Sequence, residues 1–335
     1  MIDFDYKILS TKRTTIMGTA MLLVVFFHSS IDLSRIPILQ LIKQSGDIGV
    51  DIFLIASGIG IYFSLLKHQS FVAYISSRIQ RILPAYFIIN SIWFAAWDFI
   101  LGDPDFLAFL LDISSLSFWL NGRLTTWYLS SLFLLQLLTP CYVKVLNRFP
   151  RIFIYSTILL YFSGGIILHF PEIESIFGHL LIFIFRIPAY LLGLSIGQAI
   201  HRGQSMSVHR YGIWSICLLS VGIISLAYGI FPVRIRWALK YIAYLPLALL
   251  LAFAFSKIGD KKIYTFLGTR SLEIYLLHEK VLWLFSAILR KFFNGFGENG
   301  IMVNLFAILV TFLSAEITRA LLTVLLHRKD RRKNV

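Results

Sequence analysis

Apolar residues form long uninterrupted runs along this chain, with charged residues, Pro and Gly gathered in the breaks between them. A run of about 17 to 25 apolar residues is long enough to cross a bilayer as an α-helix. The runs lack the alternation of apolar and polar positions that marks a barrel strand. The pattern predicts an all-α, polytopic transmembrane bundle of about ten spans, near 14–31, 48–66, 82–101, 124–146, 152–170, 179–199, 211–231, 237–256, 271–291 and 301–326.

The segment 106–121 departs from this pattern because Asp112 and several serines interrupt its apolar residues. We expect an interfacial or re-entrant helix there, outside the membrane. The apolar run after Arg13 is followed by no small-residue cleavage pattern, so it is assigned as the first span and not as a signal peptide. With no internal repeat of fixed period, the chain is interpreted as a single integral membrane domain, residues 1–335.

Composition supports the membrane assignment. The chain is 58% hydrophobic and 14% charged, with a mean hydropathy of +0.78, whereas soluble domains carry roughly a quarter charged residues. The net charge of +14 does not indicate nucleic acid, because the basic residues fall in short loops and build no basic face. Membrane lipid is the expected surrounding. Cys141 and Cys217 fall inside predicted spans and form no metal-binding spacing, so we expect no metal.

Lys and Arg residues are distributed unequally between alternate loops. Twenty fall on the side of the N-terminus and eight on the other. Because such residues are retained in the cytoplasm, both termini are predicted to be cytoplasmic, which requires an even number of spans. The expected location is the inner membrane of a bacterial-type cell.

His28 and Asp51 are ionisable residues within predicted spans, and on this topology both lie near the outer face. Such residues cost about 2.5 to 3.5 kcal/mol each in a bilayer and therefore need a partner, a cavity or a function. An imidazole oriented by a carboxylate is suited to act as a general base. Alternatively, His28 lies at the interface and bonds a backbone carbonyl.

The stretch GDIGVDIFLIASGIGIYF, which leads into and forms most of the second span, carries glycines at 46, 49, 58 and 60. Small residues allow helices to approach closely, so these positions predict close helix packing. Asp51, Ile55 and Gly58 share one stripe of the helix. Helix packing alone would also account for the pattern.

Arg78 and Arg81 lie one turn apart near the cytoplasmic end of the third span, just before Pro84. Two guanidinium groups on one face can bind a phosphate-bearing ligand through paired donors. An ordinary cluster of retained cytoplasmic charges is the alternative interpretation.

The ninth span begins RSLEIYLLHEK and carries Tyr275, His278 and Glu279. Residues three apart on a helix are neighbours, so Tyr275 and His278 can face one cavity. The alternative is a structural ion pair of Glu279 with Lys280 or Arg186.

Five motifs occur in a characteristic order: VVFFHSS, GVDIFLIASG, RIQRILPAY, WYLSSLF and SLEIYLLHE. In this order and spacing they resemble the acyltransferase-3 family of integral membrane O-acyltransferases, over about residues 14 to 326. Trp127, at the start of WYLSSLF, also lies where an aromatic belt is expected at the outer interface.

The resemblance implies ten helices and transfer of an acyl group, often acetyl, from cytoplasmic acyl-CoA. The implied acceptor is a hydroxyl of a cell-surface glycan, a lipid-linked sugar or a small molecule. His28 matches the family's first-span histidine, the candidate catalytic base, and Arg78 and Arg81 match its Arg-x-x-Arg pair. The second-span motif is matched by Asp51, Ser57 and Gly58.

This chain departs from the family pattern at one position. Family members commonly carry an arginine eleven residues before the histidine, and here that position is Met17, while Lys12 and Arg13 lie at least a turn earlier. Two other classes of function remain open. Buried histidine and carboxylates also suit a proton-coupled transporter of a small solute, although inverted-repeat halves are not visible. The other open class is a non-catalytic sensor or interaction protein.

Overall fold

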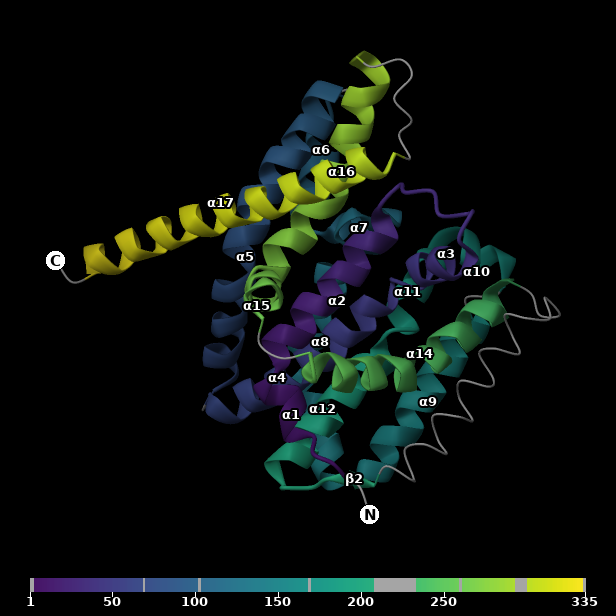
Figure 1. Ribbon diagram of the computed structural model, residues 1–335. Coiled ribbons are helices and arrows are strands. Elements are labelled where there is room, and N and C mark those ends of the chain that lie inside the picture. The colour runs from purple at the N-terminus through teal and green to yellow at the C-terminus, as the bar shows by residue number, and fades with distance from the viewer. Residues whose placement is uncertain are drawn as a thin grey trace. The chain divides into compact units, whose positions relative to one another are not determined.

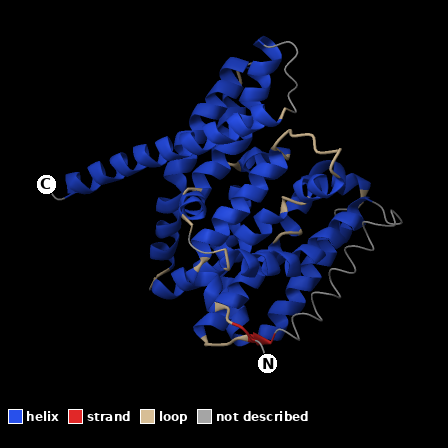
Figure 2. Cartoon of the chain, in the orientation of Figure 1, coloured by secondary structure: helices blue, strands red, loops and turns tan. Residues whose placement is uncertain are grey.

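The computed structural model describes residues 3–68, 70–101, 104–167, 170–207, 233–258, 261–292 and 300–333. Nearly all of the described chain is helical (Figure 1). Within the described ranges, the strands form a two-residue ladder, red in Figure 2, in which β1 (Asp3–Phe4) pairs antiparallel with β2 (Met206–Ser207). The predicted all-α class is confirmed.

Among the described residues, seven helical segments are long and apolar enough to cross a membrane. They are Ile48–Lys67, Phe71–Leu101, Leu124–Arg148, Pro150–Ile167, Pro171–His201, Leu239–Ser256 and Ile301–Val324. The first predicted span corresponds to α2 (Arg13–His28), which is apolar but only 16 residues long. The ninth corresponds to α16 (Ser271–Phe292). The seventh, 211–231, lies outside the described residues.

The third predicted span begins earlier than expected. α5 (Phe71–Ala96) starts eleven residues before the predicted boundary, encloses Pro84 and continues as a π-helical turn, η1 (Trp97–Leu101). Hydropathy falls where Arg78 and Arg81 appear, but a helix does not have to end where it leaves the hydrocarbon region. A proline inside it removes one hydrogen bond without necessarily ending the helix.

The sixth predicted span is interrupted. After α10 (Pro171–Phe177), the chain forms η3 (Gly178–Leu180), a short α11 (Leu181–Ile184) and α12 (Ile187–His201). Pro188 lies in the first turn of α12. Proline has no N–H, and its ring would clash with the carbonyl four residues earlier in a continuous helix, so α11 does not run on through Pro188. Arg186 occupies the N-cap position at this break.

The remaining elements include three short helices, α1 (Lys7–Thr11), α3 (Pro37–Gln44) and α15 (Lys262–Thr269), in segments that were predicted as loops. Two short helices cover the segment predicted to be interfacial, α6 (Phe106–Ile113) and α7 (Leu116–Asn121). The others are α4 (Ile48–Lys67), η2 (Leu124–Thr126), α8 (Trp127–Arg148), α9 (Pro150–Ile167), α14 (Val233–Ser256) and α17 (Ile301–Lys333).

The chain divides into two compact units. Unit 1 comprises Met1–Ile16, Val50–Ser76 and Leu110–Gly259, and unit 2 comprises Met17–Gly49, Ser77–Phe109 and Asp260–Val335. In unit 1, α4 and α12 approach each other at reciprocal glycines. A Cβ on Gly58 would meet the backbone of Tyr190, and one on Gly193 would meet the backbone of Ile55. The close helix packing predicted from the second-span glycines is confirmed here.

In unit 2, α17 packs along α16 (Figure 1). Its buried positions recur every three or four residues: Asn304, Ala307, Thr311, Ala315 and Thr318. The other side of α17 exposes large apolar residues, at Leu305, Leu309, Leu313 and Ile317. This division is typical of a membrane helix with one face on protein and the other on lipid.

Candidate functional site

His28 is the last residue of α2, and two contacts fix the end of that helix. The backbone N–H of Ser30 donates to Asn304 Oδ1 at 2.9 Å, and the Asn304 amide donates to the Ser30 hydroxyl at 3.1 Å. On another side, Gly49 lies so close that an added Cβ would be 2.6 Å from the Ala20 carbonyl oxygen. Together these contacts hold the histidine at a defined place in unit 2.

The carboxylate beside His28 is Glu279. His28 Nε2 lies 3.1 Å from Glu279 Oε1, and the two side chains are 33% and 42% exposed. Asp47, which is itself buried, also acts electrostatically on the imidazole. An Nε2–H that points to the carboxylate leaves the lone pair on Nδ1, and the partial exposure lets a substrate reach the ring.

His278 adds a second imidazole to this cluster. Its ring meets that of His28 edge to face, with centroids 5.0 Å apart, and its side chain is almost completely buried. His278 Nδ1 lies 2.7 Å from the carbonyl oxygen of Tyr275, so Nδ1 carries the proton. Nε2 is buried and has no hydrogen-bond partner within the described part of the chain. Tyr275 and His278 are neighbours on α16, with ring centroids 5.4 Å apart.

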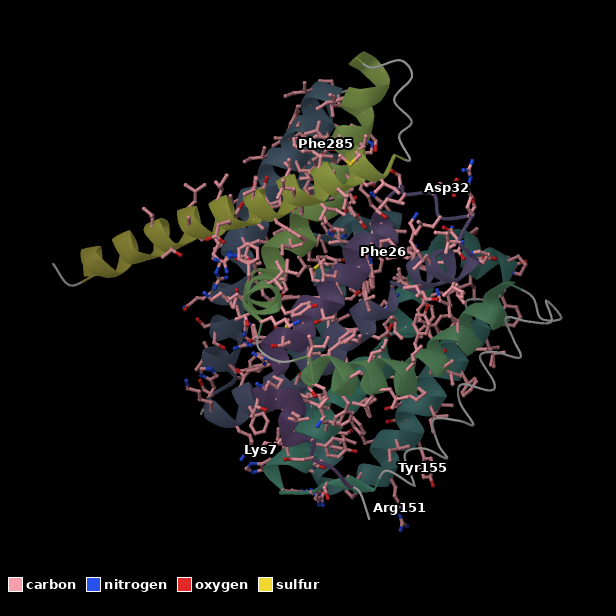
Figure 3. All side chains as sticks on the ribbon, in the orientation of Figure 1. Lys7, Phe26, Asp32, Arg151, Tyr155 and Phe285 are labelled. Carbon is pink, nitrogen blue, oxygen red and sulfur yellow. The ribbon has the colours of Figure 1, made fainter. Side chains whose placement is uncertain are left out.

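These residues come from two helices of unit 2. Figure 3 shows the side chains of α2 and α16, with Phe26 labelled on the former and Phe285 on the latter. His28, His278 and Glu279 each present one potential ligand atom within 4.8 Å of the other two. The expectation of no metal rested on the spacing of the two cysteines, and that spacing carries no information on whether α2 and α16 meet.

Three tryptophans of unit 2 pack against one another, one of them beside Lys280, and none of them was predicted as a site residue. Trp93 stacks on Trp97, and Trp283 lies edge-on to both, with centroids 5.2 to 5.9 Å apart. Lys280 Nζ lies 5.8 Å from the Trp93 ring centre and donates to the Leu276 carbonyl. The spacing of Trp283, four residues after Glu279, was the signal that both share one face of α16.

Asp51 has a different partner from the one predicted. Its carboxylate lies 2.6 Å from Arg186 Nη1, and both side chains are almost completely buried in unit 1. The guanidinium also lies over the rings of Trp127 and Tyr241, at 5.5 and 4.8 Å. The break before α12 turns Arg186 toward this site, which no local pattern in the sequence indicated. Arg186 therefore pairs with Asp51, and Glu279 pairs with His28.

Ser57 lies in the same unit as Asp51 and shares a hydrogen bond with Tyr128. Tyr128 follows Trp127 on α8 and is buried. Two of the predicted cavity residues, Ser57 and Trp127, thus belong to the surroundings of the buried Asp51–Arg186 pair.

Arg78 and Arg81 lie on α5, one turn apart, as predicted. Arg78 is partly buried and its Nε donates to the Ser77 hydroxyl at 3.2 Å, while Arg81 is exposed. Trp93 follows Arg81 by twelve positions on the same helix, about 18 Å at the rise of an α-helix. A ligand held by its phosphates at the arginines would have to run along this helix to reach the tryptophans.

Arg13 is the basic residue nearest to Met17 on α2. It precedes Met17 by four residues and therefore lies one turn away on the same helix face. Its guanidinium occupies the space that a side chain at Gly60 would fill. The glycine at position 60 thus makes room for this cation in unit 1.

The sequence comparisons agree with the family indicated by the motifs. Residues 17–318 match the model of an acyltransferase domain, the acyltransferase-3 family. No curated protein and no solved structure matches the chain significantly. The match covers most of the chain and includes His28, the Arg78 and Arg81 pair and the α16 motif. This chain therefore belongs to the acyltransferase-3 family of membrane acyltransferases.

Proposed function

We propose that this protein transfers an acyl group, acetyl in the first instance, from cytoplasmic acyl-CoA to a hydroxyl of a cell-surface glycan or lipid-linked sugar. The observation that carries the proposal is the contact of His28 Nε2 with Glu279 Oε1 at 3.1 Å, in a chain of an acyltransferase family. In the proposed topology both termini are cytoplasmic and the protein lies in the inner membrane of a bacterial cell.

His28 acts as the general base in this proposal. Its Nδ1 accepts the proton of the acceptor hydroxyl while Glu279 stabilises the imidazolium that forms. The hydroxyl oxygen attacks the thioester carbonyl, a C–O bond forms and the C–S bond breaks. The imidazolium then returns its proton to the departing coenzyme A sulfur. An acyl-enzyme route would divide the same bond changes into two steps.

Arg78 and Arg81 bind the coenzyme A phosphates in this scheme. Their positions on α5 match the family's arginine pair, and guanidinium groups suit phosphate oxygens because they offer paired donors. The pantetheine arm then follows α5 toward the tryptophans and the His28 cluster. Asp51, which the sequence suggested as the orienting acid, keeps Arg186 in place in unit 1.

The test is transfer of label from radioactive acetyl-CoA to glycan in membranes that contain the protein. His28→Ala should abolish transfer, while an immunoblot shows unchanged protein in the membrane. His201→Ala, a substitution of an exposed histidine in α12, is the matched control and should retain activity. Full activity of the His28 variant would refute the proposed base.

A proton-coupled transporter is the second candidate, because His278 and Lys280 are both buried in α16 and ionisable groups in spans often carry protons. The same experiment separates the two functions. Label on the glycan supports the transferase. Proton-dependent solute uptake without labelled glycan supports the transporter.

A further inference from the structure

We propose that His28, His278 and Glu279 form a binding site for a divalent transition-metal ion, with Zn²⁺ as the ion that fits best. The three residues each offer one ligand atom, and these atoms lie within 4.8 Å of one another. Two imidazoles and one carboxylate are a common three-residue ligand set for zinc, which leaves the fourth tetrahedral position open. The inference goes beyond the proposed acyl transfer.

His278 is already prepared as a ligand. Its Nδ1–H donates to the Tyr275 carbonyl at 2.7 Å. A backbone carbonyl on the other ring nitrogen is the usual second partner of a metal-binding histidine, because it fixes the tautomer and the ring orientation. The lone pair is then on Nε2, which is buried and has no hydrogen-bond partner among the described residues. A buried acceptor left in this state is costly, and a bound cation would satisfy it.

The distance between His28 Nε2 and Glu279 Oε1 also fits a zinc site. Zinc bonds of about 2.0 to 2.2 Å in a tetrahedron place neighbouring ligand atoms roughly 3.3 Å apart. His28 Nε2 and Glu279 Oε1 are 3.1 Å apart. Both side chains are partly exposed, so they can turn toward the fixed ring of His278.

The net charge around His28, His278 and Glu279 is negative, which favours a bound cation. Two neutral imidazoles and one carboxylate carry a single negative charge, and Asp47 adds another that acts on His28. Lys280 is the opposing charge on α16. Its Nζ donates to the Leu276 carbonyl and lies over Trp93.

Metal binding would interfere with the base proposed above. An imidazole that is bound to metal through Nε2 keeps its proton on Nδ1, and His28 then has no lone pair left for the acceptor hydroxyl. Zinc would therefore act as an inhibitor of the transferase. This consequence rests on the proposed function, whereas the metal site itself does not.

The test measures metal binding directly, without acyl donor or acceptor. The full chain, purified in detergent with its affinity tag removed and stripped with a chelator, is titrated with zinc chloride by calorimetry. We expect one site whose affinity falls at least about ten-fold in Glu279→Gln and in His278→Ala. His201→Ala is the matched control and should bind as the unsubstituted protein does.

Two further measurements keep the result interpretable. Glu279→Gln preserves the shape of a partly exposed side chain, so it reports on the site even if His278→Ala fails to fold. Zinc-edge X-ray absorption should show the scattering of two imidazoles, reduced to one in His28→Ala. Equal zinc affinity in the unsubstituted protein and in Glu279→Gln, or an equal loss in His201→Ala, would overturn the proposal. Either result would leave the acyl-transfer test unaffected.

Discussion

Glu279 on α16 lies beside His28 at the end of α2, with 3.1 Å between Oε1 and Nε2. Replacing Glu279 with Gln removes the negative charge that stabilises the imidazolium but keeps the size of the side chain. Because a positioned acid–base group contributes about 10² to 10⁴ in rate, we expect acyl transfer to fall by about 100-fold.

The control for this substitution is Glu316→Gln. Glu316 is a partly exposed carboxylate on α17 that pairs with Arg270. Initial rates of acetyl transfer should be nearly unchanged in this variant. Comparable losses of transfer rate in the two variants would mean that Glu279 does not assist His28 in acyl transfer.

Asn304 holds the segment that follows His28, through its contacts with Ser30. Asn304→Ala removes them, and a displacement of about 1 Å at a reacting group can cost 10²-fold. We expect kcat to fall between about 10-fold and 100-fold, with little change in the KM for acyl-CoA. Steady-state kinetics measures both.

Thr311→Val is the matched control for Asn304. Thr311 is buried on the same helix, but its hydroxyl donates to the carbonyl of Ala307 within α17. Loss of that bond should leave kcat nearly unchanged. If the Asn304 variant also has normal kcat, the contact with Ser30 does not position His28.

Gly49 has no room for a side chain, because a Cβ would lie 2.6 Å from the Ala20 carbonyl oxygen and 2.8 Å from Val24. Gly49→Ala should therefore destabilise the protein by about 1 to 3 kcal/mol through overpacking. In Gly165→Ala the new atom meets ring atoms of Phe185 at 3.3 Å, and the higher helix propensity of alanine opposes that contact. Thermal unfolding in detergent should show a lower midpoint for the first variant than for the second.

The buried pair of Asp51 and Arg186 predicts strong coupling between two substitutions. Asp51→Asn or Arg186→Met alone leaves a buried charge without its partner and should cost about 3 to 5 kcal/mol. The double variant should cost less than the sum, because no buried charge remains. Apparent unfolding midpoints of the four proteins form the cycle, and additive effects would contradict the pairing.

Arg78 and Arg81 are predicted to bind the phosphates of the donor. Arg78→Ala and Arg81→Ala should each raise the KM for acyl-CoA about ten-fold, equivalent to about 1.4 kcal/mol, with a smaller effect on kcat. Arg151→Ala, at an exposed position of α9 labelled in Figure 3, is the control. A KM that is equally raised by the control would point to a general effect of surface charge.

Much of the architecture could be predicted from the sequence. Runs of apolar residues located α4, α8, α9 and α16 close to their observed bounds, because a helix in lipid must satisfy its own backbone hydrogen bonds. The start of α5 and the interruption before α12 were missed. Hydropathy records where a segment leaves lipid, whereas a helix ends only where its backbone geometry changes.

The sequence by itself determined the residue types available for chemistry: a histidine at the end of α2, an arginine pair on α5 and a His–Glu dipeptide on α16. Tertiary structure alone decided their partners. His28 lies against Glu279, and Asp51 lies against Arg186. The reason is physical, because an ion pair between two helices forms only where the faces that carry the two charges meet. Close contacts between residues far apart in the sequence, such as that of Gly49 with Ala20, determine which faces meet.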